Sequence, residues 1–299
     1  MKVFNDKIIR YVTAGTLGDS FIVWSKLVGY QNRGDSIFLV RISVHEDVSP
    51  LIENFFSEST GIHVISEIVE DVSCVKRLLK QKIDEGYIPV NATFDGIPPS
   101  ELSDFKDPSY LQIDPFAVAN FNPPPSKNMR SISVQVNSGK VGFNEKHFTL
   151  KFVMLMAEIA RRYDAPLLLL GTTDYRFFSD VKDFGTSIRN NNIVNLIGRL
   201  SFEEWMEILR SSSCLVAADG FAAFYTMSSK RPVYMVYEDL GVERRLCAEW
   251  LEYSVIENIA LSGLGHKIFR YLMRTLGVTR QCEPRNIDRV AKFVRGVLN

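Results

Sequence analysis

Short apolar segments typical of strands alternate along most of this chain with amphipathic segments typical of helices. Such alternation favours βαβ units, because parallel strands need a long crossover connection that a helix supplies. In the N-terminal half, the expected strands are 8–12, 36–42, 63–65 and 88–92. The expected helices are 21–30, 49–58 and 72–85. The pattern therefore predicts an α/β fold built on a parallel sheet.

A second series of the same kind begins near residue 131. Ser201 and Glu204 have the spacing of a capping box, which predicts a helix that starts at residue 202. The expected strands of this series are 131–136, 166–171, 192–196, 214–218 and 232–236. The other expected helices are 148–163, 221–229, 242–251 and 287–297. Two such series in one chain predict two α/β units.

Between residues 97 and 127 the alternation stops and prolines accumulate, ending in three consecutive prolines at 123–125. Proline lacks a backbone donor and disrupts helices and sheets, so this stretch is a poor host for regular structure. We interpret its end as an interdomain linker, with a surface loop inside one domain as the alternative. The expected division is 1–125, 126–283 and a C-terminal helix at 284–299.

The composition excludes several classes of protein. Lys and Arg together number 35, as do Asp and Glu, and this zero net charge argues against general electrostatic binding of nucleic acid. No apolar run approaches the roughly 20 residues of a membrane span. The four cysteines are widely spaced, which with the lack of a signal peptide favours free thiols and a cytoplasmic setting. The four histidines lack metal-ligand spacing, so we expect no metal.

The first candidate site is the turn Thr16-Leu17-Gly18-Asp19-Ser20, which follows the expected strand 8–12. In an open α/β sheet, ligands bind at the carboxyl ends of the strands. Gly18 and Asp19 therefore stand where a first β–α loop presents a base to a ligand. From the residues alone, the alternative for Asp19 is a helix N-cap.

The second half carries polar or glycine residues after three expected strands, and each group suits part of a nucleotide. Gly171 permits a sharp turn, and Thr172 and Asp174 are placed to reach ribose or phosphate oxygens. Backbone groups at Ile197 and Gly198 suit the edge of a base.

The third group, Asp219 and Gly220, precedes an expected helix, whose N-terminus suits phosphate. Lys146, in a glycine-containing loop, suits the charge of a diphosphate. Each of these features, taken alone, is also explained by an ordinary loop, cap or solvated lysine.

In order and spacing, these segments resemble the heptosyltransferase-type family of GT-B glycosyltransferases (glycosyltransferase family 9). The resemblance covers most of the chain and is strongest from Leu167 to Val236. The segments that carry it are Thr16-Leu17-Gly18-Asp19, Lys146-His147-Phe148-Thr149, Leu167–Gly171, Leu196-Ile197-Gly198-Arg199-Leu200-Ser201 and Leu215-Val216-Ala217-Ala218-Asp219 with Arg231-Pro232-Val233 downstream.

The resemblance implies a GT-B fold, in which two Rossmann-like α/β/α domains face each other across a cleft. It assigns 1–125 to the acceptor side and 126–283 to the nucleotide sugar, and it implies that the C-terminal helix packs back on the N-terminal domain. It further implies transfer of a hexosyl or heptosyl group from a nucleotide-diphosphate sugar to an acceptor hydroxyl, without metal or cofactor. Asp19 is then the general base, and the donor-binding residues are Gly18, Lys146, Gly171, Thr172, Asp174, Ile197, Gly198, Asp219 and Gly220.

The resemblance also implies a glycan, a glycolipid or another hydroxyl compound as acceptor, and work in the cytoplasm or at the inner face of the membrane. The basic and aromatic segment 267–285 suits a peripheral contact with anionic lipid or polymer, with a solvated helix face as the alternative. A modified nucleic acid as acceptor is disfavoured by the zero net charge.

Two other functions stay open, and a departure from the family pattern favours the non-catalytic one of them. Phe221 stands at the usual glycine and Phe224 at the usual histidine, and a phenyl ring cannot hydrogen-bond phosphate as imidazole does. The alternatives are a sugar-nucleotide epimerase or hydrolase on the same scaffold, and a non-catalytic nucleotide-sugar-binding protein.

Overall fold

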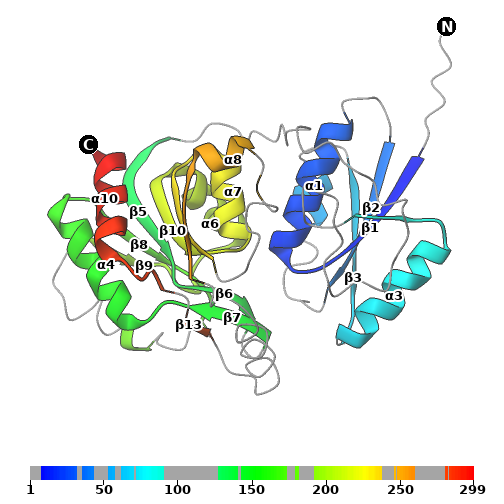
Figure 1. Cartoon of the computed structure of the whole chain (residues 1–299), viewed down its shortest axis with the longest axis horizontal. Coiled ribbons are helices and arrows are strands. Elements are labelled where there is room, and N and C mark those ends of the chain that lie inside the picture. Colours follow the sequence, from blue (N-terminus) through cyan, green and yellow to red (C-terminus); the bar gives the residue numbers. More distant parts are fainter. Residues whose placement is uncertain are drawn as a thin grey trace, which may run out of the picture. The chain divides into compact units, whose positions relative to one another are not determined.

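The computed structural model of the chain contains two compact units (Figure 1). One comprises Met1–Asn122 with Glu243–Glu249, and the other Pro123–Val242 with Trp250–Asn299. The residues that the structure describes are 8–31, 36–43, 53–57, 62–70, 72–90, 127–140, 143–173, 179–181, 192–237, 246, 248–259, 280–281 and 283–299. The expected linker and the boundary after residue 125 lie outside the described residues and stay predictions.

The first unit is a four-stranded parallel sheet in the order β3-β2-β1-β4. A single helical turn at 53–57 lies inside the helix expected at 49–58. The strands and helices are β1 (Ile8–Ala14), β2 (Ser36–Ser43), β3 (His63–Ile68), β4 (Ile88–Pro89), α1 (Leu17–Gln31) and α3 (Val72–Asp84). All of them were expected from the alternation, although α1 begins four residues before the expected start at residue 21.

The two faces of this sheet carry different helices, since neighbouring residues of a strand point to opposite sides. Val12 and Val40 pack with Leu79 of α3 on one face. On the other face α1 buries Trp24, whose ring stacks on Phe56 at a centroid distance of 4.9 Å. The Trp24 indole N–H also donates to the Phe56 carbonyl oxygen at 3.2 Å, which satisfies the polar group of this buried ring.

The second unit contains a six-stranded parallel sheet in the order β12-β11-β10-β5-β8-β9. Its strands are β5 (Met129–Gln135), β8 (Leu167–Leu170), β9 (Ile193–Asn195), β10 (Ser212–Ala218), β11 (Val233–Tyr237) and β12 (Ser254–Asn258). All but β12 were expected. The second unit therefore has the same α/β architecture as the first, as the two series predicted.

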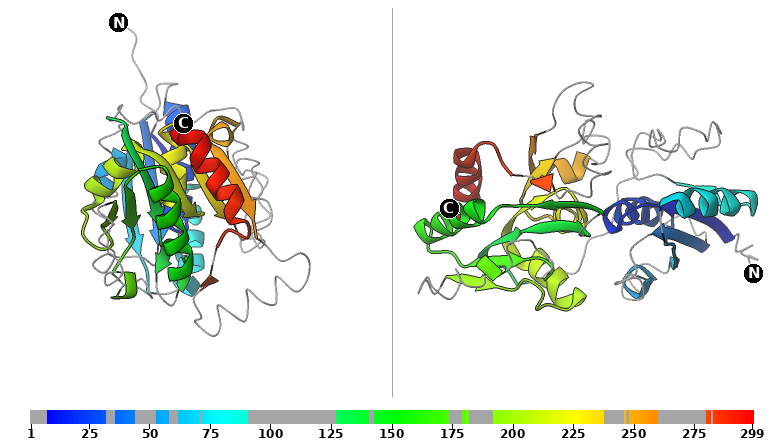
Figure 2. Two further views of the ribbon diagram at one scale, coloured as in Figure 1. Left: turned by 90° about the vertical axis from the view of Figure 1, so that its left-hand side faces the viewer. Right: turned by 90° about the horizontal axis from the view of Figure 1, so that it is seen from below.

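Helices cover both faces of this sheet (Figures 1 and 2). The helices α4 and α10 lie side by side on one face, and α6 and α7 cover the other. Their bounds, with those of the short α8, are α4 (Leu150–Arg162), α6 (Phe202–Ser211), α7 (Phe221–Ser228), α8 (Ala248–Glu252) and α10 (Ile287–Leu298). Local chemistry sets three of the starts, because Thr149, Ser201 and Asn286 each accept a first-turn N–H; the Ser201–Glu204 capping box is confirmed.

A small second sheet was not expected. The strands β6 (Asn137–Lys140) and β7 (Phe143–His147) pair antiparallel, and β13 (Arg280–Gln281) adds in parallel to β7. The interpretation of this stretch as a loop was therefore wrong, and Lys146 lies in a strand. The reason is that hydrogen bonds to neighbouring strands hold a segment whose own sequence has no apolar alternation.

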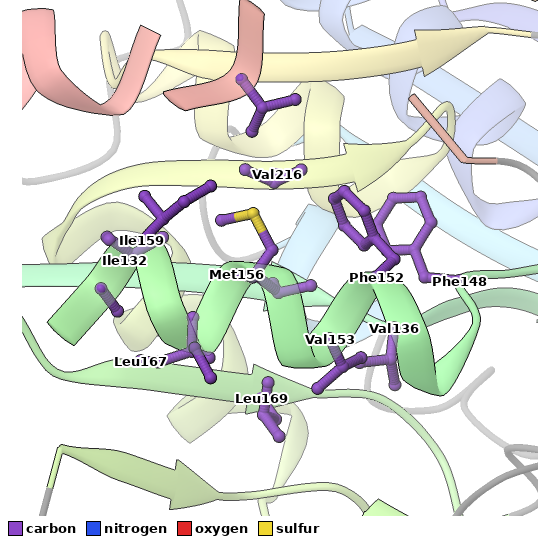
Figure 3. Close-up of a cluster of buried hydrophobic side chains, with 14 of the residues drawn as sticks. Ile132, Val136, Phe148, Phe152, Val153, Met156, Ile159, Leu167, Leu169 and Val216 are labelled. Atoms are coloured by element: carbon purple, nitrogen blue, oxygen red, sulfur yellow. The ribbon is translucent and has the colours of Figure 1, made fainter. Parts of the chain in front are cut away.

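The core of the second unit lies between its sheet and the α4–α10 face (Figure 3). Phe152 and Met156 of α4 point toward the side of Val216 on β10, and Val153 points toward the side of Leu169 on β8. Because α4 has an apolar stripe at helical spacing, it buries one face and leaves its charged residues in solvent.

The C-terminal helix α10 corrects one expectation. Val290 and Val294 on α10 are fully buried in the core of the second unit, and Phe293 makes an edge contact with the Tyr234 ring at 5.6 Å. The expected packing of this helix on the N-terminal domain is therefore wrong. Valines four residues apart make a stripe along α10 that matches the apolar face of the adjacent strands.

The described residues bear on three other expectations. None of their helices combines the length and apolar character needed to cross a membrane. No three of their His, Cys, Asp or Glu side chains are grouped so as to hold a metal ion. Cys74 and Cys214 are free thiols, and burial raises the pKa of Cys214 to about 12, so this thiol is inert at neutral pH. The other two cysteines lie outside the described residues.

The packing of α10 generates a first prediction. Val294→Ala removes two fully buried carbon atoms and should lower the free energy of unfolding of the second unit by about 2 kcal/mol. Urea unfolding monitored by circular dichroism measures this change. The control is Lys292→Ala on the exposed side of the same helix, and an equal effect of the two substitutions would contradict the assigned packing.

Candidate functional site

The candidate residues of the second unit lie along one edge of its sheet. In a parallel sheet all strands end at the same edge, and β10, β5, β8 and β9 are consecutive neighbours. The residues that directly follow these four strands therefore form a continuous row: Asp219 and Gly220, Val136 to Ser138, Gly171 and Thr172, and Leu196 to Gly198. The expected groups after three strands are brought together, and the segment after β5 joins them.

An ion pair lies at one end of this row. The ammonium group of Lys146 on β7 contacts the Oδ1 atom of Asp219, and each side chain is only 12% exposed. Both residues were expected to bind a donor, but no spacing rule predicts that they pair with each other. A lysine ammonium and a carboxylate partly shielded from water are screened less than a surface pair, so this contact is a strong local constraint.

Asn137 connects the ends of β5 and β8. Its side-chain amide donates to the Thr172 hydroxyl at 2.8 Å and accepts from the Thr172 backbone N–H at 3.1 Å. Gly171 is required beside it, because a Cβ atom there would lie 2.5 Å from Asn137 Oδ1. The Thr172 side chain is exposed but held, so its hydroxyl has a defined direction at the edge of the sheet.

The turn after β9 uses its backbone donors internally. The Ile197 N–H donates to Asn195 Oδ1 at 3.1 Å and the Gly198 N–H to the Gly171 carbonyl oxygen at 2.8 Å. The Ile197 side chain is fully buried in the core. Gly198 has a φ of +64°, and a Cβ atom there would lie 2.1 Å from Thr173 Cγ2, so only glycine fits. A ligand at this turn would meet carbonyl oxygens.

The helix α7 begins at this edge, directly after Asp219 and Gly220. Gly220 is its N-cap, and glycine has no side chain that could accept a first-turn N–H. First-turn N–H groups have no partner inside a helix, and the N-terminal end of the dipole favours negative charge. A Cβ atom at Gly220 would lie 3.7 Å from Ser138 Cβ, an ordinary contact, so the two segments approach without crowding.

The two phenylalanines that depart from the family pattern are part of the core. Phe221 stacks on Tyr225 and packs against Phe202 and Trp205 of α6, with ring centroids 5.4–5.8 Å apart. Phe224 stacks on the Trp250 ring. Both rings are almost entirely buried. The helix that carries Gly220 at its start is thus anchored by aromatic packing.

The aromatic group is also tied to the edge of the sheet. The Trp205 indole N–H donates to Gln135 Oε1 at 3.0 Å, and the Gln135 amide donates to the Asn137 carbonyl oxygen at 2.9 Å. The connection runs on through the Asn137 side chain to Thr172. This chain of hydrogen bonds fixes the segment after β5 between its two neighbours.

In the first unit, Asp19 lies in the first turn of α1. Its Oδ2 atom accepts from the Thr16 backbone N–H at 3.0 Å and from the Thr16 hydroxyl at 2.9 Å. Thr16 is therefore the N-cap and Asp19 the third helical residue, as in a capping box. The alternative of Asp19 as the N-cap itself was wrong, since the helix begins before it. Gly18 is buried in the same turn.

A buried arginine supports this turn. Arg41 on β2 donates from Nε to the Ser20 hydroxyl at 3.2 Å and from Nη1 to the Ser66 hydroxyl at 3.0 Å. The Ser20 hydroxyl in turn donates to the Thr16 carbonyl oxygen at 3.0 Å. Burial lowers the pKa of Arg41 to about 10, opposed by the charge of Glu53, so the guanidinium stays protonated at neutral pH.

Sequence reasoning missed Asn137 and Arg41, and it named Thr16 in the candidate turn without giving it a role. Asn137 had a signal, because it directly follows an expected strand whose neighbours on the sheet were already candidates. Thr16 had the spacing of a capping box with Asp19. Arg41 had none, since a charged residue inside a strand is normally a solvent-facing one. Asp174 lies outside the described residues.

The comparisons with known proteins identify the fold. No protein-family model and no curated protein matches this chain. It is similar to E. coli ADP-heptose LPS heptosyltransferase II, with a TM-score of 0.56 and 12% identity over 97% of this chain and 98% of that one. It is similar to the glycosyl transferase family 9 protein of Veillonella parvula DSM 2008, with a TM-score of 0.60 and 10% identity over 100% and 98% of the two chains.

E. coli heptosyltransferase WaaC with ADP has a TM-score of 0.51 and 11% identity over 89% of this chain and 97% of that one. Similarity that spans nearly whole chains at such low identity is similarity of fold. The chain therefore has the fold of the GT-B glycosyltransferases, and the resemblance to the heptosyltransferase type is confirmed at that level.

The geometry of the α1 turn generates a second prediction. A Cβ atom at Gly15 would lie 2.8 Å from both Cβ and Oδ2 of Asp19, so Gly15→Ala should displace this carboxylate from Thr16. We expect a loss of about 1–3 kcal/mol in stability of the first unit, measured by urea unfolding. Gly296→Ala on α10, where a Cβ meets nothing within 4 Å, is the control. A Gly15 variant as stable as this control would show that the turn has room.

Proposed function

We propose that this protein is a glycosyltransferase that moves a sugar from a nucleotide-diphosphate sugar to an acceptor hydroxyl, without metal or cofactor. The observation that carries the proposal is the row of candidate residues along the edge of the second sheet, with Lys146 at one end. The GT-B fold supports it, because in open α/β sheets ligands bind at this edge. The fold alone does not define chemistry, so the proposal depends on these side chains.

On the donor side, Lys146 and the first turn of α7 at Gly220 are assigned to the diphosphate. A lysine is a compact cation, and the positive end of a helix dipole favours negative charge, so together they suit a leaving group that gains negative charge. The Thr172 hydroxyl is assigned to ribose or phosphate oxygens. The carbonyl oxygens of Ile197 and Gly198 are left for the edge of the base.

On the acceptor side, Asp19 is assigned the role of general base. The acceptor oxygen attacks the anomeric carbon while its proton passes to the Asp19 carboxylate, and the bond from that carbon to the diphosphate breaks. Both hydrogen bonds from Thr16 go to Oδ2, and this orients the carboxylate. Hydrogen bonds from Arg41 to Ser20 and from Ser20 to the Thr16 carbonyl oxygen hold the turn in place.

The substrates are proposed by class. Three structures of this fold belong to proteins named as heptosyltransferases or as a family 9 glycosyl transferase, so a hexosyl or heptosyl donor is the first choice. The proposed acceptor is a glycan, a glycolipid or another hydroxyl compound. The proposed setting is the cytoplasm or the inner face of the membrane.

The packing of Phe224 favours one further candidate, a nucleotide-sugar-binding protein without turnover. Its ring is buried against Trp250, and a phenyl group gives no hydrogen bond to a phosphate. A panel of nucleotide sugars, incubated with and without sugar acceptors, separates the functions by product analysis. Transfer only with acceptor supports the transferase, release or inversion of the sugar without acceptor indicates a hydrolase or epimerase, and binding without product indicates the binding protein.

The role of Asp19 generates a third prediction. Asp19→Asn should lower the turnover of transfer by about 100-fold or more, because an amide cannot take the proton of the acceptor hydroxyl. Binding of the nucleotide diphosphate, measured by calorimetry, should be unchanged. Thr16→Ser keeps the hydroxyl that caps the helix and serves as the control with near-normal turnover. Near-normal turnover of the Asn variant would remove Asp19 from the mechanism.

The role of Lys146 generates a fourth prediction. Lys146→Ala should weaken the binding of nucleoside diphosphates by about tenfold or more, since it removes a charge-assisted contact to phosphate. Calorimetry with ADP, UDP, GDP and CDP measures the effect. Lys151→Ala, which removes an exposed lysine from α4, is the control for the change in net charge. Equal affinities of wild type and the Lys146 variant would place the diphosphate elsewhere.

A further inference from the structure

Lys146, the cation that the proposed function gives to the phosphate, is already paired with an anion of the chain. Its ammonium group contacts Asp219 Oδ1, and the two side chains are equally shielded, at 12% exposure. Carboxylate and phosphate oxygens accept the same charge-assisted hydrogen bonds from an ammonium group. A phosphate that binds Lys146 therefore has to compete with this carboxylate.

The backbone holds both partners of the pair in place. The Asp219 N–H donates to the Val236 carbonyl oxygen at 3.0 Å, which continues the ladder between β10 and β11 past the end of β10. Lys146 pairs with Ser138 on β6 and with Arg280 on β13. Because two separate sheets fix the two backbones, forming the ion pair costs only the rotamer freedom of the two side chains.

The carboxylate also lies next to the α7 N-terminus, since Asp219 directly precedes the N-cap Gly220. An anion at this helix start would lie close to the like charge of the Asp219 carboxylate. Two like charges in a partly shielded position repel, so the carboxylate opposes phosphate binding in addition to occupying Lys146.

We propose that Asp219 is an internal competitor of the phosphate and sets the affinity of the site for diphosphate. The inference rests on the proposed donor site and adds a step to it, in which Asp219 releases Lys146 as the phosphate binds. When the competent form is only a fraction of the population, the apparent affinity falls by that fraction. Neutralising Asp219 should thus strengthen binding of a bare diphosphate, although Asp219 was first assigned as a donor-binding residue.

Asp219→Asn tests this inference with inorganic pyrophosphate as the probe. The substitution keeps the size of the side chain and removes its charge, and pyrophosphate lacks the base and the sugar, so it reports on the phosphate position alone. Calorimetry at low ionic strength should give an affinity at least tenfold higher than that of wild type, the factor expected when the open form is about a tenth of the population.

Two further variants make the result specific. In the double variant Lys146→Met with Asp219→Asn the gain should disappear, because the released cation is no longer there. Glu67→Gln takes a carboxylate from the Lys82–Glu67 pair of the first unit, which has a distance of 2.7 Å, and it changes the net charge equally. This control should bind pyrophosphate as wild type does. Thermal unfolding checks that each variant is folded, and Asp219→Ser takes the place of an Asn variant that is not.

The possible outcomes separate this inference from the proposed function. Affinity of Asp219→Asn equal to or below that of wild type overturns it, and so does a gain that persists in the double variant or appears in Glu67→Gln. Sugar transfer by wild type together with such a result rejects the inference and leaves the transferase intact. A gain that depends on Lys146, in a protein that transfers no sugar from any donor of the panel, supports the inference and rejects the transferase.

Discussion

The position of β5 between β10 and β8 determines where the candidate site of the second unit lies. Parallel pairing aligns Gln135 of β5 with Ala217 of β10 and with Leu170 of β8, so the three strands end together. Asp219, Asn137 and Gly171 then follow at the same edge, although they are far apart in the sequence. The register of the strands places these side chains at one edge, before any contact between the side chains themselves is considered. The hydrogen bonds from Asn137 to Thr172, and the Lys146–Asp219 ion pair, refine that placement.

The fold was largely predictable because its elements carry their signals locally. The strand β8 is a run of four leucines that ends in glycine, and α4 has an apolar stripe at helical spacing. What could not be predicted depends on contacts made after folding. The hairpin of β6 and β7 is polar and contains glycine, and its strands persist because neighbours complete their hydrogen bonds. The C-terminal helix showed its amphipathic pattern but not its partner, since an apolar stripe fits any apolar surface of the right shape.

The candidate site was predictable residue by residue but not as an arrangement. Strand ends pointed to Gly171, Gly198 and Asp219, because the carboxyl edge of a parallel sheet is where ligands bind. Lys146 and Asp219 were both expected to serve a donor, yet 73 positions separate them and no spacing rule connects them. The same limit applies to Arg41, whose hydrogen bonds to Ser20 and Ser66 join three elements of the first unit. Its burial is explained by its hydrogen bond to Ser20, which lies in the turn that carries Asp19.

The aromatic substitutions and the ion pair belong to one electrostatic argument. The buried Phe224 ring gives α7 no group that hydrogen-bonds phosphate. In the proposed donor site, neutralisation of the phosphate then falls to Lys146 and the start of α7. A lysine shielded to this degree is costly to leave without a counter-charge, and Asp219 supplies one. The Phe224 ring strengthens the core around α7 but offers no hydrogen bond to a phosphate. The proposed site therefore depends on Lys146, which is already paired with Asp219. In the proposed donor site, the affinity for phosphate depends less on the number of donors than on how readily Asp219 releases Lys146.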